Sequence, residues 1–303
     1  MLYTRDIFCF NIMCADIYEG SIFRPPSEAY SLILQATIGC SWNRCTFCVA
    51  FQDKDFRAKS LDQLRADVEK VYPRYKAARR IFLADGNALV LPTDQLEATL
   101  RFLYKKFKNL ERVTMYGGPL DIKKKSAEEL KRLKKAGLKM IYFGLESGSD
   151  EVLKLVKKGA SSKLMIETGL KVKESGIPLS VIWILGLGGK ALSREHALET
   201  ARVISAQDPE YGAALTLMVE PGSRILKDVK SGKIELLNPE EALAELRLSI
   251  KNINTTNMLF RANHASNYVT FRGNLKRDRK NLIDQIDAAL EDAEYKPEFL
   301  RRL

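Results

Sequence analysis

Residues 39–48 read Gly-Cys-Ser-Trp-Asn-Arg-Cys-Thr-Phe-Cys, and this short stretch contains three of the five cysteines of the chain. Cys40, Cys45 and Cys48 have the spacing C-x4-C-x2-C, and the apolar run of residues 31–38 before them is typical of a buried strand. Three thiolates this close in sequence face one point only if a loop wraps around a ligand. That ligand is usually a metal ion or an iron–sulfur cluster. The loop offers no fourth cysteine or histidine, so the site is either incomplete or has an open coordination position.

A structural zinc site is the alternative interpretation of the loop. Zinc in such sites takes four protein ligands, and the remaining candidates in the chain are all distant in sequence. They are Cys9, Cys14, His196 and His264. Cys9 and Cys14 are too few to bind a second cluster, so we expect neither of them to be a ligand.

Composition favours a folded protein without a membrane span. The 303 residues are enough for one large α/β domain or two smaller ones, and a hydrophobic content of 46% supports a substantial core. Charged or polar residues interrupt every apolar segment before it reaches the length of a membrane span. Residues 1–15 are a poor signal peptide for the same reason. The clustered cysteines suit a reducing compartment, so we expect a cytoplasmic protein.

The chain is basic, with 49 Lys and Arg against 38 Asp and Glu and a net charge of +11. Such an excess suits nucleic acid, an anionic substrate or an acidic electron donor as a partner. The simpler interpretation is a solvated, lysine-rich surface, because runs such as Lys123-Lys124-Lys125 fall at helix starts or on polar helix faces.

Short apolar strands alternate with amphipathic helices along most of the chain. The predicted strands cover residues 31–38, 80–84, 113–116, 140–145, 179–185 and 213–219. Six strand–helix units in a row imply a parallel sheet, since each helix supplies a right-handed crossover. Six units are too few to close a (β/α)8 barrel. The sequence therefore predicts an α/β fold, an open partial (β/α)6 barrel.

The alternation stops at about residue 225, which suggests three parts. We expect an extended lead-in over residues 1–30, the (β/α)6 core over 31–224, and a C-terminal extension over 225–303 that covers the open side of the barrel. Helical spacing predicts one helix at 239–251 and a last one around 282–290. Between them, residues 260–268 are rich in polar and aromatic side chains.

Glycines and polar residues follow several of the predicted strands. Examples are Asp85-Gly86-Asn87 after the second strand, Glu146-Ser147 after the fourth and Gly186 to Gly189 after the fifth. In parallel α/β barrels the carboxyl ends of the strands carry the function, because the loops there are free to vary. Each signal alone is weak, but together they predict one functional rim that includes the cysteine loop.

With these features, residues 31–222 resemble the radical S-adenosylmethionine (SAM) enzymes. The commonest cysteine spacing in that superfamily is C-x3-C-x2-C, and Phe47 matches the aromatic residue before its last cysteine. The segment Gly144 to Leu153 is similar to methylthiotransferases and the elongator catalytic subunit, and oxygen-independent coproporphyrinogen oxidase is another relative. The resemblance implies a [4Fe–4S] cluster on Cys40, Cys45 and Cys48, whose fourth iron chelates the amino and carboxylate groups of SAM.

The same resemblance implies further cofactor-binding residues. The aromatic Phe47 lies beside the cluster. Asp85, Gly86 and Asn87 fall at the motif that meets the methionyl amino group through its backbone. Glu146 and Ser147 fall at the ribose-contacting position, for which Glu146 has an alternative role as a helix N-terminal cap.

The remaining implied cofactor contacts follow the fifth and sixth strands. Gly186 and Gly188 match the glycine motif beside the adenine, and Glu220-Pro221 match a stretch whose backbone also meets adenine. Arg202 corresponds to a ribose- or carboxylate-binding arginine of some relatives. A surface arginine is the alternative interpretation of Arg202.

The substrate side is poorly marked. His264 and Tyr268 are candidate catalytic residues that reach over the barrel mouth as proton donors or substrate ligands. The alternative is that both satisfy the hydrogen bonds of a buried loop.

The mechanism implied by the resemblance is cofactor chemistry. An external donor such as flavodoxin or ferredoxin reduces the cluster, SAM is cleaved reductively to methionine and a 5′-deoxyadenosyl radical, and that radical abstracts hydrogen from an unidentified substrate. Two alternatives stay open. One is a radical SAM enzyme that modifies RNA, and the other is a non-catalytic α/β protein that binds zinc or nucleic acid.

Overall fold

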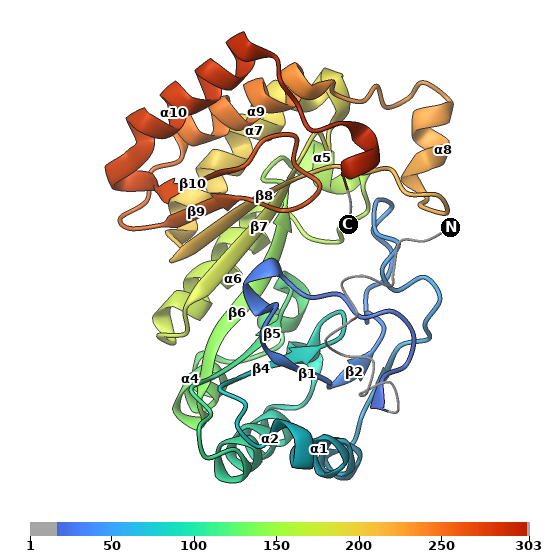
Figure 1. The fold of residues 1–303 in the computed structure, drawn as a ribbon, viewed down its shortest axis with the longest axis vertical. Helices are drawn as coiled ribbons and strands as arrows, with labels where there is room; N and C mark the ends of the chain where they lie inside the picture. Colours follow the sequence, from blue (N-terminus) through green and yellow to red (C-terminus); the bar gives the residue numbers. More distant parts are fainter. Residues whose placement is uncertain (1–16, 302–303) are drawn as a thin grey trace.

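The structure is a computed structural model that describes residues 17–301 (Figure 1). Cys9 and Cys14 lie outside the described residues. An eight-stranded sheet has the order β1-β4-β5-β6-β7-β8-β9-β10. The strands are β1 (Leu32–Gln35), β4 (Arg80–Ala84), β5 (Arg112–Tyr116), β6 (Leu138–Glu146), β7 (Leu179–Leu185), β8 (Tyr211–Thr216), β9 (Leu259–Ala262) and β10 (Phe271–Asn274).

The first seven strands of this order are parallel, and only β10 is antiparallel to its neighbour β9. β1 and β10 do not pair with each other, so within the described residues the sheet stays open. Consecutive strands are neighbours because each crossover helix packs back on the same face of the sheet. The predicted α/β fold and the partial barrel are confirmed.

Ten α-helices accompany the strands in residues 17–301. They are α1 (Leu61–Tyr75), α2 (Thr93–Lys106), α3 (Pro119–Lys123), α4 (Ala127–Ala136), α5 (Asp150–Leu155), α6 (Ser162–Glu174), α7 (Gly189–Gln207), α8 (Ile225–Lys230), α9 (Pro239–Asn252) and α10 (Leu275–Asp292). Most of them form an arc around the sheet, from α1 and α2 at the bottom of Figure 1 to α9 and α10 at the top. The main hydrophobic core lies between this arc and the outer face of the sheet.

Local sequence signals account for the helix boundaries. Ser60 caps α1 and forms a capping box with Gln63, as Ser and Gln at this spacing favour. Gly137 ends α4 with a φ of 112°, a left-handed conformation that glycine adopts without strain. A side chain there would also collide with the Tyr104 ring, since a Cβ atom would lie 2.2 Å from it.

The lead-in segment packs against the inner face of the sheet. Tyr18 and Ile22 contact the inner cluster that contains Ile33 and Phe82. Glu28, in the short 3-10 helix η3 (Pro26–Glu28), is fully buried, and its carboxylate accepts a hydrogen bond of 2.6 Å from the Tyr142 hydroxyl. A buried carboxylate needs such partners and a nearby cation. Arg112 supplies the cation, 2.8 Å away, and the lead-in segment is thereby bound to the inner face of the sheet.

The C-terminal extension departs from the prediction. Helices α9 and α10 lie where helical spacing predicts them, but β9 and β10 also lie in this part and continue the sheet beyond β8. The predicted C-terminal helical extension therefore contains two strands in addition to its helices. Leu259-Phe260-Arg261-Ala262 alternates exposed and buried residues, as a half-buried strand does. A run of four residues is too short for this alternation to stand out in the sequence.

The first predicted strand is also divided. Residues Leu32–Gln35 form β1, whereas β2 (Thr37–Ile38) leaves the main sheet and pairs antiparallel with β3 (Arg57–Ala58). The cysteine loop connects β2 and β3. It is therefore carried at the carboxyl end of β1 by a small separate sheet.

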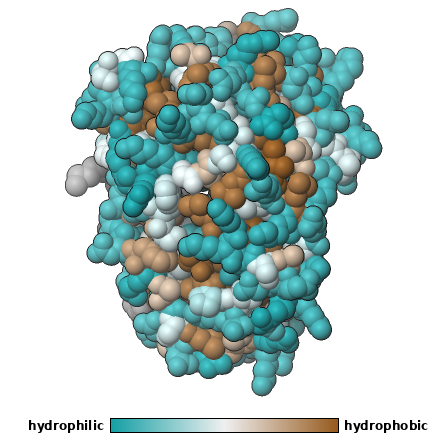
Figure 2. Space-filling model, turned by 180° about the vertical axis from the view of Figure 1, so that it is seen from behind, coloured by the Kyte–Doolittle hydropathy of each residue, from teal (hydrophilic) through white to brown (hydrophobic). Residues whose placement is uncertain are grey.

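The surface is predominantly hydrophilic. Seen from behind, apolar residues gather in patches near the middle of the face and hydrophilic residues surround them (Figure 2). None of the helices in residues 17–301 combines the length and the apolar character that crossing a bilayer requires.

Candidate functional site

Cys40, Cys45 and Cys48 lie together on the loop between β2 and β3. All three are partly buried, and none of them forms a disulfide. Burial raises the pKa of the Cys48 thiol to about 11 and also raises that of Cys45. These two thiols are protonated at neutral pH until a metal binds, so loading the site releases protons.

Side chains from the carboxyl end of β4 hold the first cysteine. The backbone N–H of Gly39 donates to Asp85 Oδ2 at 3.0 Å, and that of Ser41 donates to Asn87 Oδ1 at 3.0 Å. These two hydrogen bonds flank Cys40 on both sides. Lys54 lies 2.8 Å from Asp85 Oδ2 and balances the charge of this buried carboxylate.

Gly86 lies directly against the same cysteine. A Cβ atom on Gly86 would come within 2.6 Å of the Cys40 Cα and 2.7 Å of the Gly39 carbonyl oxygen. Only glycine permits two backbones to approach this closely. The predicted cofactor motif 85–87 is thus built into the cysteine loop: its two polar side chains bind the loop, and its glycine packs on it.

The opposite side of the loop is bound by the segment after α5. Trp42 Nε1 donates to the Lys157 carbonyl at 2.9 Å, and the Thr46 N–H donates to the Val156 carbonyl at 2.9 Å. The Trp42 ring lies against Gly159, where a Cβ atom would come within 2.2 Å of it. These contacts join the cysteine loop to the carboxyl side of β6.

A third support comes from the segment that enters α8. The Arg224 guanidinium donates to the Asn43 carbonyl at 2.6 Å, and the Ile225 N–H donates to the Thr46 carbonyl at 2.8 Å. Asn43 itself has a left-handed conformation with φ of 40°, and its side chain donates to the Phe51 carbonyl at 2.7 Å. Asparagine tolerates this conformation better than most residues, which accommodates a first cysteine gap of four residues.

Phe47 packs into a small hydrophobic cluster next to the cysteine loop. This cluster contains Val152 and Val156 of the α5 region, Leu187 after β7 and Ile225 of α8. The aromatic side chain therefore fixes the last two cysteines against the ends of β6 and β7.

Glu146 ends β6 and forms an ion pair with Lys158. The ammonium lies 2.9 Å from Glu146 Oε1, and both side chains are 13% exposed. Burial lowers the pKa of Lys158, but the carboxylate of Glu146 more than offsets this, so the net pKa is raised and Lys158 stays charged. Its charge also acts on Cys45, whose thiol pKa it lowers in part. Lys158 is thus a cation between Glu146 and the cysteine loop.

Ser147 points into the core and not to the rim. It is fully buried, and its hydroxyl lies 2.8 Å from His196 Nδ1 of α7. The predicted role of the Ser147 side chain at a ribose is therefore not supported, because the hydroxyl is already bound between β6 and α7. His196 Nε2 lies 3.5 Å from Glu245 of α9.

The buried Glu245 connects this network to the end of β7. Its Oε1 atom accepts a hydrogen bond of 2.7 Å from the Gly186 N–H. Gly186 has a φ of 77°, which glycine adopts without strain. Gly188 lies close to Val152 and Leu192, each 2.9 Å from where its Cβ would be. The glycine motif after β7 is thus held from α9, which belongs to the C-terminal extension.

Two other predicted cofactor positions are more exposed. Glu220 and Pro221 follow β8 and lie on the turn that leads to Arg224 and the cysteine loop, where the Ser223 N–H donates to the Glu220 carbonyl. Arg202 lies on α7, where its guanidinium donates to Glu199 at 2.7 Å and its side chain is 50% exposed. Within the described residues Arg202 forms this surface ion pair and has no hydrogen bond to the cysteine loop, which supports its alternative interpretation as a surface arginine.

His264 lies two residues after β9, at the same end of the sheet as the cysteine loop. Its Nδ1 accepts a hydrogen bond of 3.1 Å from the Ser266 N–H. Burial, with a smaller effect of Lys296, lowers the pKa of His264. The imidazole is therefore neutral at pH 7, with its proton on Nε2.

Tyr268 has a structural environment. Its hydroxyl contacts Glu298 at 2.5 Å and Arg301 at 2.6 Å, and the Arg301 guanidinium lies 4.0 Å from the centre of its ring. The second catalytic candidate is therefore saturated with partners and serves to bind the C-terminal segment. The alternative interpretation of Tyr268 as part of a buried, satisfied loop is the one that the contacts support.

The loop supplies three thiols, the number that a cubane cluster with one open iron needs, whereas a structural zinc site takes four protein ligands. The donor set consists of three cysteines on one loop, and the Lys158 ammonium acts on Cys45 among them. Among the residues that the structure describes, no three Cys, His, Asp or Glu side chains converge closely enough to bind a single metal ion. His196 and His264, the described candidates for further zinc ligands, are bound to Ser147 and Ser266. Three thiolates leave one iron of a cubane cluster open.

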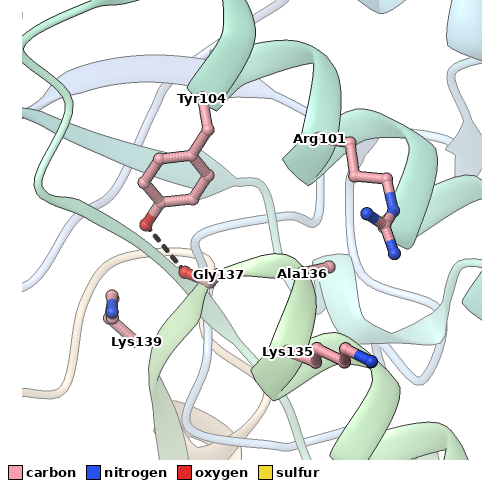
Figure 3. A pocket seen from close by; sticks show the side chains of 6 residues that line it. All are labelled: Arg101, Tyr104, Lys135, Ala136, Gly137 and Lys139. Carbon is pink, nitrogen blue, oxygen red and sulfur yellow. Dashed lines mark hydrogen bonds between the residues drawn. The ribbon is translucent and has the colours of Figure 1, made fainter.

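A surface pocket of about 460 Å³ lies at the other end of the sheet (Figure 3). It is lined by Arg101, Tyr104, Lys135, Ala136, Gly137 and Lys139, next to the start of β6. The Tyr104 hydroxyl donates to the Gly137 carbonyl at 2.7 Å. This pocket is therefore remote from the carboxyl ends of the strands and has no part in the site.

Sequence inspection did not identify Lys158 or Glu245 as site residues. Lys158 lies in a lysine pair that resembles a solvated run, and Glu245 is one of several glutamates in α9. A weak signal existed for Glu245: it lies between Leu243 and Leu246, which face the core.

A search of protein families matches residues 34–204 to the model described as the radical SAM superfamily. The heme chaperone HemW of Bacillus subtilis (strain 168) is 27% identical over 173 residues, which is 55% of this chain and 44% of HemW. This chain spans less than half the length of the curated relatives that it matches.

Solved structures support the same fold. Coproporphyrinogen III oxidase of Escherichia coli, a radical SAM enzyme, has a TM-score of 0.56 and 16% identity, covering 73% of this chain and 51% of that chain. Methylornithine synthase has a TM-score of 0.50 and 13% identity, covering 88% of this chain and 82% of that chain. At these identities the similarity establishes the fold alone.

Proposed function

Because this chain belongs to the radical SAM superfamily, we propose that Cys40, Cys45 and Cys48 bind its [4Fe–4S] cluster and that the rim formed by β4, β6 and β7 binds SAM. The chain is an enzyme of this superfamily, whose cofactors are the cluster and SAM. When bound, the reduced cluster supplies the electron that cleaves SAM to methionine and a 5′-deoxyadenosyl radical. The residue assignments are the proposal.

The observation that carries the proposal is the way the cysteine loop is bound. Hydrogen bonds from the ends of β4, from the segment after α5 and from the entry to α8 reach the loop on three sides. A loop without regular structure otherwise loses conformational entropy on binding its metal. Here the neighbouring segments order it in advance.

The residues around the loop have distinct proposed roles. Gly86 offers backbone groups next to Cys40, where the methionyl end of SAM would lie. Glu146 is a partly exposed acceptor for ribose hydroxyls, and Lys158 orients it. Gly186, fixed by Glu245, presents backbone groups to the adenine. Glu220 and Pro221 close the adenine side from the turn after β8.

The substrate lies on the inner side of the sheet in this proposal. His264 is neutral, has its proton on Nε2 and lies near the end of β9, which suits a proton donor or a hydrogen-bond donor to substrate. Residues 31–224 bind the cofactors, and residues 225–303 complete the barrel wall. An external reductant such as flavodoxin or ferredoxin would act at the cluster, and the three free cysteines suit a reducing compartment such as the cytoplasm.

Anaerobic reconstitution tests the proposal. The parent protein is expected to bind about four iron atoms per chain and to form 5′-deoxyadenosine from SAM after reduction with dithionite. Cys40→Ala, Cys45→Ala and Cys48→Ala are each expected to abolish both. Cys9→Ala and Cys14→Ala are matched controls that change neither.

The opposite results would refute the assignment. Iron binding that survives the loss of all three loop cysteines excludes this cluster site. Stoichiometric zinc with no cleavage of SAM selects the zinc alternative.

A further inference from the structure

Two arginines lie side by side on the last two strands of the sheet. Arg261 of β9 and Arg272 of β10 are direct partners in the antiparallel register, so their Cβ atoms are about 4.5–5.5 Å apart. Both side chains are exposed. Neither guanidinium forms a hydrogen bond or an ion pair with any residue in the described part of the chain.

The alternation of side chains fixes the direction in which this pair points. Phe260, Ala262 and Phe271 belong to the hydrophobic core against the helices. Successive side chains of a strand point to opposite faces. Arg261 and Arg272 therefore lie on the inner face of the curved sheet.

Without a bound anion, the arginine pair destabilises the folded state. Like charges directly opposite each other destabilise an antiparallel pair. An anion bound between two guanidinium groups removes this repulsion and gains charge-assisted hydrogen bonds. The planar guanidinium is also the side chain best matched to a carboxylate or a phosphate.

The sheet register places this pair in line with the proposed SAM rim. Arg261 is beside Ala213 of β8, Ala213 is beside Ile182 of β7, and Ile182 is beside Gly144 of β6. Three steps between neighbouring strands separate Gly144 from Arg261, which is about 14 Å along the sheet. Gly144 lies against Glu146, whose Oε1 would be 2.3 Å from a Cβ atom at this glycine.

The residues between the two ends are apolar and accessible. Ile182 and Ala213 are both partly exposed on the inner face, although neighbouring residues of the same strands are buried. We propose that Arg261 and Arg272 bind the anionic group, a carboxylate or a phosphate, of a small substrate whose apolar part lies over Ile182 and Ala213. This proposal rests on the proposed function, because it takes the Glu146 end of the row as the cofactor side.

Calorimetry on the anaerobically reconstituted protein tests the site. Inorganic phosphate and glutarate are titrated separately at fixed ionic strength. At least one of them is expected to bind saturably, with a Kd on the order of 1 mM, and the tighter probe distinguishes a phosphate site from a carboxylate site. Arg261→Gln and Arg272→Gln are each expected to weaken this binding about tenfold or more. Arg80→Gln removes an exposed arginine at the start of β4 and is the matched control.

A thermal measurement gives a second readout. Because the two arginines repel each other, Arg272→Gln is expected to unfold at a higher temperature than the parent when no anion is present. Saturating probe should remove this difference. A structural arginine would give the reverse result, a lower unfolding temperature after substitution.

Three outcomes would overturn the anion site: no saturable binding of either probe, equal weakening by Arg80→Gln, or arginine-dependent binding of a single-stranded RNA without binding of the small anions.

The variant Cys40→Ala separates this proposal from the proposed function, because it should lose iron and keep anion binding. Normal iron and SAM cleavage without anion binding refutes only the anion site. Arginine-dependent anion binding in a protein that takes up no iron refutes only the proposed function.

Discussion

The buried ion pair between Lys54 and Asp85 gives the sharpest test of how the cysteine loop is held. Its nitrogen and oxygen are 2.8 Å apart, and the two side chains are 3% and 0% exposed. The same oxygen of Asp85 accepts the Gly39 N–H, next to Cys40. Removing one partner of a buried pair leaves an uncompensated charge and costs about 3–5 kcal/mol. Lys54→Met should therefore lower both stability and iron uptake.

The pKa of Asp85 adds a pH dependence to this prediction. Burial raises this pKa, although Lys54 and the hydrogen bonds to the carboxylate act in the opposite direction. Without Lys54 the pKa rises further. When a carboxyl group has a higher pKa in the folded state than in the unfolded state, it favours folding while it is protonated. The protein then loses stability as the pH rises from the unfolded-state pKa to the folded-state pKa. The penalty of Lys54→Met is therefore larger at pH 8 than at pH 5.

Thermal unfolding of the metal-free variant, followed by circular dichroism, measures this effect. For a chain of this length, a loss of 3 kcal/mol corresponds to a decrease in Tm of about 5 °C. The double variant Lys54→Met/Asp85→Asn should recover most of the decrease, because neither charge then remains. Asp67→Asn is the matched control: Asp67 pairs with the buried Lys59 at 2.6 Å, away from the loop. It should lower Tm and leave iron uptake unchanged. A Lys54→Met protein with normal Tm and normal iron would refute the reasoning.

Three further predictions address other parts of the site. Gly86→Ala places a methyl group 2.6 Å from Cys40, so the iron content should fall strongly while the far-UV circular dichroism stays unchanged. A normal iron content would contradict this prediction, because it would show that the loop moves freely. Glu245→Ala leaves the Gly186 N–H without its acceptor, at a cost of about 1–3 kcal/mol, and should weaken SAM binding about tenfold in equilibrium dialysis, whereas Glu245→Gln restores an acceptor and most of the affinity. His264 has a pKa below its usual value, so the folded state resists its protonation. The free energy of unfolding should therefore rise with pH between the folded-state pKa and the unfolded-state pKa of about 6.5. The urea midpoints of His264→Gln should lack this rise.

The sequence predicted those parts of the fold that depend on local patterns. Strands Arg80–Ala84 and Leu179–Leu185 match their expected bounds, because hydrophobic periodicity acts within a few residues. Strand Leu259–Ala262 was missed. Its place in the sheet is decided by pairing with β8, which no local pattern expresses.

The candidate site also contains residues that the sequence alone identified and residues that only the fold identified. The cysteines and Gly86 were recognisable because their residue types are restricted by chemistry and by close packing. Lys158 and Glu245 were not, since a lysine or a glutamate acquires its role only when the fold buries it beside a partner. In the opposite direction, Tyr268 resembled a catalytic residue in the sequence, but its hydroxyl is saturated by Glu298 and Arg301.

The spacing of the cysteines has a physical explanation in the loop itself. An additional residue between the first two cysteines lengthens the backbone, and the excess must be taken up without moving either thiol. Asn43 does this with its left-handed backbone and its hydrogen bond to Phe51. Arg224 then binds the Asn43 carbonyl from outside. The four-residue gap is therefore held by contacts within this chain, from the Asn43 side chain to Phe51 and from Arg224 to the Asn43 carbonyl.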